Sequence, residues 1–399
     1  MNHATSDPEH ANHDFVIGWV SPIGVELEEE RSSSSNSEPP DDSKSPIGVV
    51  KLFFGDSFGH HTIRMVEAIR NLTLPEELAL SDFDSKDYFK KTRARQQAGN
   101  ALRLSTSLDS VLAHHCVYTI SEIRKAHSEK PRIIQVRSLK HPDEARLLRR
   151  IYGESFFLIG VHASFSDRKE KLRAKCEGSE DRAHDLIVHD TFESDESGQN
   201  TRDLFELCDA FISRTQVENG KPTWKSDLER ILRLCTSHLD EVPRHDDFGM
   251  QVAYNASFRS GDLSRQVGAA LFDQQGRMIA VGRNDAPRPR GGLYQVGEPD
   301  DVSDYALGFD PGQRYRHELV QEAAKRVADG LKHLRLENLS GKDIDAKCLP
   351  AVEAALEKSP VKDIIEFGRS VHAEMDAILS AAAKGFPVAS STLYTTTFP

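Results

Sequence analysis

A chain of 399 residues, 38% of them hydrophobic, is long enough for two or three domains with apolar cores of their own. Its formal net charge of −12 argues against a protein that binds duplex nucleic acid, because phosphate contacts need a basic surface. The five cysteines form no Cys-x-x-Cys pair, which argues against a disulfide framework and indicates reduced thiols in a cytoplasmic protein.

The first half of the chain alternates short apolar runs with amphipathic stretches. Residues 1–14 are polar, so no signal peptide is expected, and the longest apolar run, 156–161, has the length of a strand rather than of a membrane span. This alternation predicts an α/β fold with a mainly parallel sheet. We expect strands over 15–20, 62–66, 133–136, 156–161 and 186–188, and helices over 87–104, 142–152 and 167–175.

Two local signals refine this expectation. Pro142 suits the first position of a helix, and Asp143 and Glu144 are well placed in the first turn against the helix dipole. Residues 32–46 are rich in serine and proline and bury too little apolar surface to fold, so we expect a disordered surface insertion there.

The loop after the first strand can be compared with the phosphate-binding pattern Gly-x₄-Gly-Lys-[Ser/Thr]. If Gly24 is the second glycine, Trp19 stands at the first, and Val25 and Glu26 replace the lysine and the hydroxyl. The phosphate loses its main counter-charge and gains a repelling carboxylate. We therefore expect a P-loop-kinase-like fold with doubtful hydrolysis, in which Gly24 is the candidate nucleotide-binding residue. The cations Arg168, Lys169, Lys171 and Arg173 could form a phosphate-facing lid or, as such runs usually do, a solvated helix face.

A second unit is expected over 225–399, after a first domain over 1–220. Its signals are helical spacing, then a β-hairpin with a turn at 273–276, then a charged helical insertion over 296–365. Ser370 is the expected N-cap of the last helix, and Gly385 is its expected C′ residue. We expect helices over 227–234, 246–259, 316–334, 350–357 and 370–384, and strands over 266–272, 278–282 and 392–396.

The sequence His372-Ala373-Glu374 matches the first half of the zinc-deaminase pattern His-x-Glu … Pro-Cys-x-x-Cys. In such enzymes a three-ligand Zn²⁺ activates water for attack on C4 of cytosine, and a glutamate that is not a ligand carries the proton. At a helix start the two side chains lie about 200° apart, at roughly 100° per residue, so one can bind metal while the other reaches the substrate.

His-x-Glu alone is a weak signal, because a second copy occurs at residues 127–129 in a polar stretch that we interpret as solvated surface. The copy at 372 opens a capped helix, and a strand follows it. Pro399 then falls where the proline of Pro-Cys-x-x-Cys belongs. The apolar side of that helix is expected to carry Ala377, Ile378, Ala381 and Ala382.

Further segments resemble deoxycytidylate deaminases. Residues 259–270 (RSGDLSRQVGAA) resemble their first helix-to-strand segment, 280–287 (AVGRNDAP) their Gly-x-Asn-x-x-Pro loop, and 392–399 (TLYTTTFP) the strand before their cysteines. With the upstream domain, in which 137–144 and 156–161 carry the likeness, nearly the whole chain resembles the bacterial anti-phage dCTP/dCMP deaminases. The resemblance implies a cytidine-deaminase-like α/β/α domain after a P-loop-kinase-like one.

The resemblance also implies roles for individual residues. It makes His372 a zinc ligand, Glu374 the general acid/base, Asn284 a sugar contact and Arg265 a candidate phosphate contact, with the backbone of Ala373 touching the base. Two alternatives stay open. Asn284 could simply serve turn chemistry, and Arg265 could be an exposed cation at a helix end.

The chain departs from the family pattern after Pro399, where both cysteine ligands and their helix would follow. With His372 as the only identifiable ligand, zinc should not bind tightly, and we expect the chain as it stands to be an inactive fragment of a longer protein. The cysteines present lie too far apart to substitute: Cys116, Cys176, Cys208, Cys235 and Cys348.

The leading hypothesis is zinc-dependent hydrolytic deamination of a free deoxycytidine nucleotide, dCTP or dCMP to dUTP or dUMP. By family resemblance, this reaction would deplete the pool that a phage needs. One alternative is a nucleic-acid-editing deaminase, against which the charge weighs. The other is a catalytically dead regulatory protein that senses nucleotides. No membrane partner is expected, and homo-oligomerisation stays open.

Overall fold

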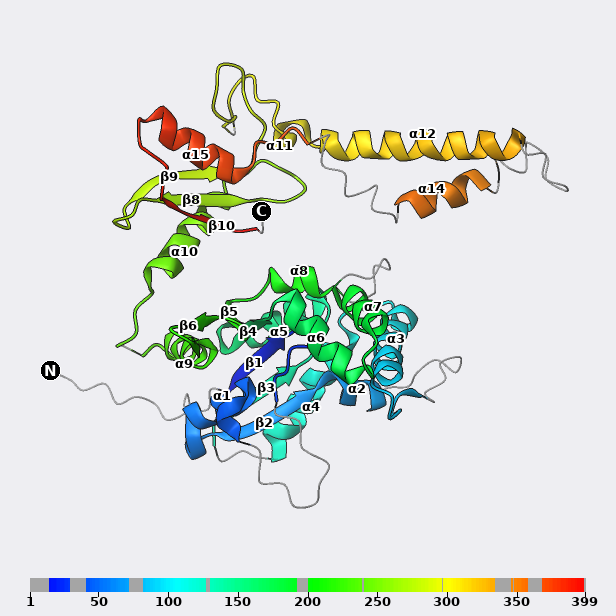
Figure 1. Cartoon of the computed structure of the whole chain (residues 1–399), viewed down its shortest axis with the longest axis vertical. Helices are drawn as coiled ribbons and strands as arrows, with labels where there is room; N and C mark the ends of the chain where they lie inside the picture. Colours follow the sequence, from blue (N-terminus) through cyan, green and yellow to red (C-terminus); the bar gives the residue numbers. More distant parts are fainter. Residues whose placement is uncertain are drawn as a thin grey trace. The chain divides into compact units, whose positions relative to one another are not determined.

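The computed structural model describes residues 14–28, 41–71, 82–126, 130–191, 200–238, 240–295, 297–333, 346, 348–357 and 368–397. The chain divides into two compact units, Met1–Glu241 and Val242–Pro399 (Figure 1). The second copy of His-x-Glu, at 127–129, and Pro399 lie outside the described residues.

In the described part of the first unit, five parallel strands form one sheet in the order β2-β3-β1-β4-β5, which confirms the expected parallel α/β architecture. The central strands are almost wholly buried, as continuous apolar runs predict for strands covered on both faces. Inside the sheet, the Trp19 indole N–H donates to Oε1 of Gln135 at 3.1 Å. The strands are β1 (Phe15–Val20), β2 (Gly59–Arg64), β3 (Arg132–Arg137), β4 (Phe156–His162) and β5 (Ala210–Ser213).

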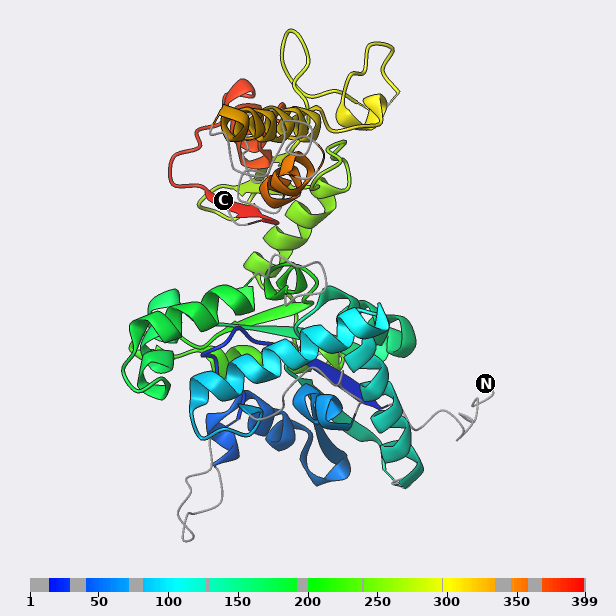
Figure 2. The ribbon, with the colours of Figure 1, turned by 90° about the vertical axis from the view of Figure 1, so that its right-hand side faces the viewer.

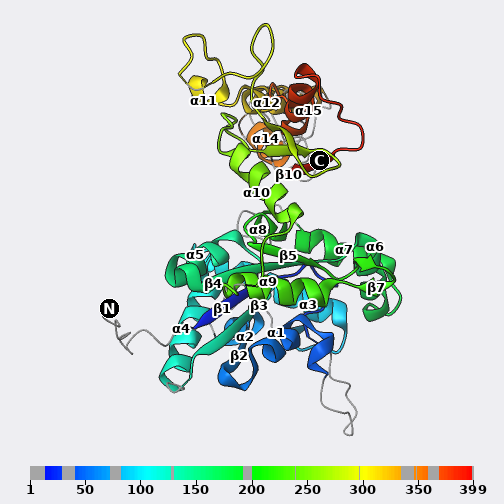
Figure 3. The same ribbon diagram turned by 90° about the vertical axis from the view of Figure 1, so that its left-hand side faces the viewer.

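Helices cover both faces of this sheet, which Figures 2 and 3 show from opposite sides. Alternation along β1 sends Val16 and Val20 into one core, with α2, α3, α4, α5 and α8, and Ile17 and Trp19 into the other, with α1 and α9. The helices are α1 (Pro46–Phe54), α2 (Met65–Asn71), α3 (Tyr88–Thr106), α4 (Val111–Ala126), α5 (Pro142–Tyr152), α6 (Phe165–Lys175), α7 (Glu180–Thr191), α8 (Thr201–Phe205) and α9 (Trp224–Cys235).

Several expectations for this unit need correction. The prediction of a strand over 186–188 is wrong. These residues lie inside α7, where Leu186 and Ile187 pack with Leu172 of α6. Strand β2 ends before Met65, which begins α2, and the edge strand β5 was not expected. Of the expected disordered insertion over 32–46, residues 32–40 lie outside the described residues. Its end is ordered, because the Ser45 hydroxyl accepts from the Gly48 N–H and caps α1.

The domain boundary also lies later than expected. Helix α9, placed by the sequence in the second unit, packs Leu228, Ile231 and Leu232 into the core beneath β1. The first unit accordingly extends to Glu241. In the part of the chain that the structure describes, no helix is both long enough and apolar enough to cross a membrane.

The described part of the second unit is a three-layer arrangement. Strands β8 (Gly268–Phe272), β9 (Met278–Arg283) and β10 (Thr392–Thr395) form an antiparallel sheet in the order β10-β8-β9, which confirms the expected hairpin. Helices α10 (His245–Ser257) and α15 (Ala373–Ala383) cover its opposite faces (Figure 1). The charged region contributes α11 (Asp304–Leu307), α12 (Pro311–His333) and α14 (Leu349–Glu357), and α14 packs on α12.

Glycines let the two helices lie directly on the strands. A Cβ on Gly268 would stand 1.9 Å from the Ala253 carbonyl oxygen of α10, and one on Gly282 would stand 2.1 Å from the Ala373 carbonyl oxygen of α15. Both positions therefore exclude any side chain. These two glycines thus determine how closely α10 and α15 approach the sheet.

Candidate functional site

The His-x-Glu motif lies at the start of α15. The helix begins at Ala373, and His372 is its N-cap residue in extended conformation with an exposed side chain. The expected N-cap, Ser370, is wrong: its hydroxyl donates instead to Oδ2 of Asp262 at 2.6 Å. Gly385 ends the helix as expected, with φ +79° and its N–H on the Ala382 carbonyl.

Two sequence motifs that lie far apart along the chain meet beside this helix start. Asp285 and Val371 form an antiparallel bridge, with N···O distances of 2.8 and 3.4 Å, so the Gly-x-Asn-x-x-Pro loop lies against the residue before His372. The close contact of Gly282 with Ala373 adds a second junction. Glu374 is half-buried, and its Oε1 accepts from the Thr395 hydroxyl of β10 at 2.9 Å.

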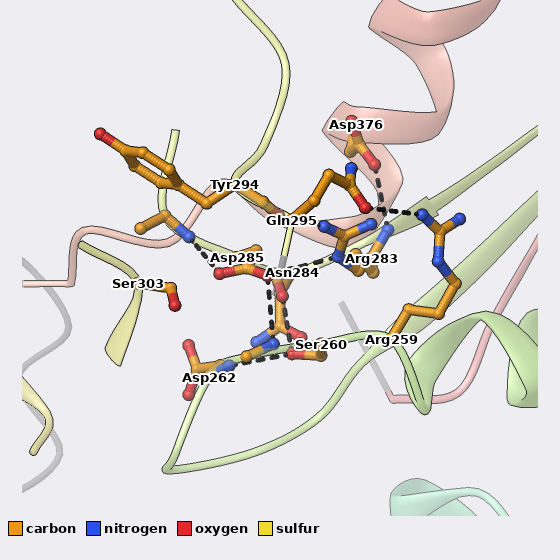
Figure 4. Close-up of polar contacts among 12 residues, drawn as sticks. Arg259, Ser260, Asp262, Arg283, Asn284, Asp285, Tyr294, Gln295, Ser303 and Asp376 are labelled. Atoms are coloured by element: carbon orange, nitrogen blue, oxygen red, sulfur yellow. Dashed lines mark hydrogen bonds and ion pairs between the residues drawn. The ribbon is translucent and has the colours of Figure 1, made fainter. Parts of the chain in front are cut away.

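The side chain of Asn284 makes three hydrogen bonds with the protein, and Figure 4 shows it beside one of its partners, Ser260. Its Oδ1 accepts from the Val267 N–H at 2.7 Å and from the Ser260 hydroxyl at 2.9 Å, and its Nδ2 donates to the Arg265 carbonyl at 2.7 Å. The amide thus ties the loop over 260–267 to the end of β9 rather than closing a turn of its own. This contact set gives Asn284 a structural role in the position where the resemblance implies a sugar contact.

Arg265 does not end a helix, because α10 stops at Ser257 and the chain runs on as a loop to β8. Its guanidinium donates to the Thr397 hydroxyl at 3.3 Å, just past β10. Arg265, Asn284, His372 and Glu374 are thereby gathered around one end of the antiparallel sheet.

Two buried carboxylates that sequence reasoning missed hold these loops in shape (Figure 4). Asp285 accepts from the Gly261 N–H at 3.1 Å, from its neighbour's N–H at 2.8 Å, and from Arg283 at 3.3 Å. Asp262 accepts from Ser264, from the Arg265 N–H and from Ser370. Burial alone would raise the pKa of Asp262, but these hydrogen bonds outweigh it, and the pKa is lowered. Both residues stand inside the sequence stretches that resemble deaminases, Asp262 in 259–270 and Asp285 in 280–287, and their acidic character there was the available signal.

The residues around His372 do not make a zinc site by themselves. A catalytic zinc takes three protein ligands. Among the described residues, no group of three His, Cys, Asp or Glu side chains with metal-site spacing includes His372.

A group that could hold a metal ion does occur in the first unit. Ligand atoms of Asp109, His141 and Asp143 all lie within 4.8 Å of one another. The buried His141 also caps α5, since its Nδ1 accepts from the Asp143 N–H at 3.2 Å and Glu144 completes the capping box. Two carboxylates and an imidazole do not select among divalent cations. The sequence indicated the start of a helix at Pro142 but did not indicate Asp109. Asp109 is distant in sequence and lies near His141 and Asp143 only because of the tertiary fold.

The expected nucleotide-binding residue Gly24 lies in the first unit, in a turn closed by the Val25 N–H on the Pro22 carbonyl at 3.1 Å, with φ +87°. Of the cations expected as a lid, Lys169 and Arg173 pair with Glu180 on the surface, as a solvated helix face would, while Arg168 donates to the Ile23 carbonyl of this turn at 2.9 Å.

A scan of protein-family models and a search of curated proteins found no match for this chain.

Proposed function

We propose that residues 242–397 carry part of a site for hydrolytic deamination of a free deoxycytidine nucleotide, dCTP or dCMP. The observation that carries the proposal is the Asp285–Val371 bridge. It brings the Gly-x-Asn-x-x-Pro loop against the start of the helix that carries His-x-Glu. Zinc deaminases of cytosine use the histidine and the glutamate of this second motif in catalysis. Either motif alone would be weak support.

Glu374 is the proton carrier in this proposal. Deamination adds water across the N3=C4 bond of cytosine, which places one proton of the water on N3. The second proton must then move from the new hydroxyl to the amine, which leaves as ammonia. Oε1 of Glu374 accepts from Thr395, which orients the carboxylate. Oε2 is then the atom we assign to accept the proton and return it.

Arg265 and the loops held by Asn284 form the nucleotide side of the proposed site. The half-buried guanidinium of Arg265 supplies a positive charge beside Thr397, which suits a phosphate. The net charge of −12 on the whole chain favours a small nucleotide over a nucleic-acid polymer as the substrate. A zinc ion would need ligands in addition to His372, and Glu374 is not among them.

The experiment compares Glu374→Gln with the parent, in the chain together with whatever its reading frame encodes beyond Pro399. Uracil nucleotide formation from dCTP and dCMP is measured. The variant should lose at least ~10²–10⁴-fold in turnover with unchanged metal content, because the amide keeps the shape and removes the proton carrier.

Glu322→Gln on α12 is the matched control. It makes the same chemical change in an exposed Glu322–Arg326 pair and should leave turnover unchanged. Normal deamination by Glu374→Gln would remove Glu374 from its role. Deamination of single-stranded DNA in preference to free nucleotides would replace the proposal by the editing alternative.

A further inference from the structure

The carboxyl ends of all five parallel strands of the first unit meet at one edge of the sheet. The chain runs from β1 outward to β2 and back to β3, and then crosses to β4 and β5 on the other side of β1. The end of β1 is therefore a topological switch point, where open α/β sheets hold their ligands.

The turn after β1 presents a backbone donor at this edge. Gly24, with φ +87°, occupies the third position of the turn Pro22–Val25, a place that requires a left-handed residue in a type II turn. The Ile23 N–H takes no part in the turn and donates to Oδ2 of Asp190 at 2.7 Å.

Asp190, from the last turn of α7, is only 1% exposed, and it also accepts from a cation. Nζ of Lys140 donates to its Oδ1 at 2.6 Å and to the Ser21 carbonyl at 2.8 Å. The backbone of Lys140 is itself fixed, because its N–H donates to Glu144 and its carbonyl accepts from Asn200. A carboxylate thus lies between a loop N–H and a lysine, the donor pair with which such loops hold phosphate.

Two half-buried arginines near this edge each have a buried nitrogen with an unused donor. Among the described residues, Nη2 of Arg168 and Nη1 of Arg214 are buried without a hydrogen-bond partner. Arg168 lies beside the turn through its bond to the Ile23 carbonyl, and Arg214 follows β5 directly, stacked over the Trp224 ring at 4.2 Å. A buried donor without an acceptor is destabilising, and an anionic ligand would supply the missing acceptor.

The charges at this edge are unlike those of the whole chain. Arg64 and Arg137, at the ends of β2 and β3, share the single carboxylate of Glu28. Ser138, directly after β3, has φ +68°, a conformation that non-glycine residues rarely adopt away from functional or tightly constrained sites. Another carboxylate, Glu26, pairs with Lys175 and also acts on Arg214. The cations at this edge still outnumber the carboxylates, in a chain of net charge −12: they are Arg64, Arg137, Lys140, Arg168, Lys175 and Arg214, against Glu26, Glu28 and Asp190.

We propose that this edge binds a phosphate group, and that Asp190 is a built-in competitor that occupies the phosphate position until it is displaced. The ligand class is a phosphate-bearing small molecule, and its donors are the Ile23 N–H, Lys140 and Arg168. This inference does not rest on the deaminase proposal, which concerns the other unit.

The test is pyrophosphate binding to the whole chain, measured by calorimetry for the parent and for Asp190→Asn. The variant keeps an acceptor for the Ile23 N–H and removes the competing charge, so its affinity should rise at least tenfold. Asp209→Asn is the matched control: Asp209 also accepts a backbone N–H, from Leu158, and pairs with an arginine, but it precedes β5 at the opposite edge. Its affinity should equal that of the parent.

A second variant keeps the proposal falsifiable if Asp190→Asn does not fold. Arg168→Gln removes a guanidinium with one hydrogen bond and should fold, and it should lose at least tenfold in pyrophosphate affinity. Titrations with ATP and dCTP separate recognition of phosphate alone from recognition of a nucleotide, which would bind more tightly. The proposal would be overturned if neither the parent nor Asp190→Asn bound pyrophosphate. It would also be overturned if Asp190→Asn and Asp209→Asn gained equally in pyrophosphate affinity.

Discussion

The two units bury their helices on their sheets by different means. In the first, large side chains such as Trp19, Ile47 and Leu148 fill two cores on either side of five strands. In the second, the core beneath α15 is mostly alanine, and the helices approach the strands through Gly268 and Gly282. Burial stabilises by about 25 cal/mol per Å² of apolar surface, so small side chains contribute less. The difference indicates that the first unit carries most of the stability.

The outward faces of the second unit extend this contrast. Tyr254 of α10 and Phe258, the residue that caps its end, are 53% and 69% exposed, and Met375 and Leu379 of α15 are 53% and 59% exposed. Ala377 and Ala381 are buried, as expected for the apolar side of α15. The expectation is wrong for Ile378, which is 38% exposed, and for Ala382, which is also exposed. Patches of this kind promote association when nothing covers them.

The largest expected effect comes from separating the units. Residues 1–241 should stay soluble and unfold cooperatively, whereas 242–399 should aggregate, remain metal-free and show no deaminase activity. Within the described residues β10 is an edge strand, and its Leu393 and Tyr394 offer a template for intermolecular pairing. Solubility and thermal unfolding of the two pieces measure this. A soluble, sharply melting 242–399 piece would contradict the contrast.

A smaller but sharper effect is expected from one added methyl group. Gly282→Ala would drive Cβ into the backbone of α15, at 2.1 Å from the Ala373 oxygen, and should destabilise the second unit by at least ~1–3 kcal/mol. Gly99→Ala is its control within α3, where the nearest atoms stand 3.8 Å away and the helix should gain about 0.5–1 kcal/mol. Urea unfolding of both variants gives the comparison; equal effects would refute it.

Replacing Asn284 tests whether its amide is structural. Asn284→Ala leaves the Val267 N–H and the Arg265 carbonyl without their partner and should cost about 1–3 kcal/mol in the second unit. Thermal unfolding measures this loss without any substrate. A variant as stable as the parent would return Asn284 to a purely substrate-binding role.

The smallest effect is expected from acid. The pKa of Asp262 is lower in the folded protein than in the unfolded chain, so its contribution is present above the unfolded value near 4 and is lost as pH falls through the folded value. In Asp262→Asn, the free energy of unfolding of the second unit should therefore fall less steeply as the pH is lowered below about 4. If the variant and the parent lose stability identically below pH 4, the hydrogen bonds of Asp262 do not act in this way.

Local signals predicted the elements that local chemistry determines. Helix α5 begins at Pro142 and ends at Tyr152 as expected, because proline at its first position and acidic residues in its first turn act within the element. Residues 186–188 are apolar in succession and read as a strand, but α7 buries Leu186 and Ile187 against Leu172, a partner that only the tertiary fold supplies. The half-exposed edge strand β5 carried no periodic signal.

The same division holds for the sites. The sequence patterns placed His372 and Glu374 at the start of a helix and Asn284 in the loop after a strand, and the structure has them there, because each pattern is short and local. They could not predict that Asn284 would be engaged by the protein, nor that Asp190 would reach the turn after β1. That contact joins α7 to a loop far away in sequence, and no local pattern encodes it.

The only two tryptophans of the chain, Trp19 and Trp224, both belong to the first unit. Trp19 is fully buried, with its indole N–H on Gln135, and Trp224 lies under the guanidinium of Arg214. Their fluorescence emission therefore reports on one half of the molecule alone, and no dye or label is needed. In the intact chain, tryptophan emission can follow the unfolding of the first unit, while circular dichroism follows the unfolding of both units. An unfolding transition that circular dichroism detects and emission does not therefore belongs to the second unit.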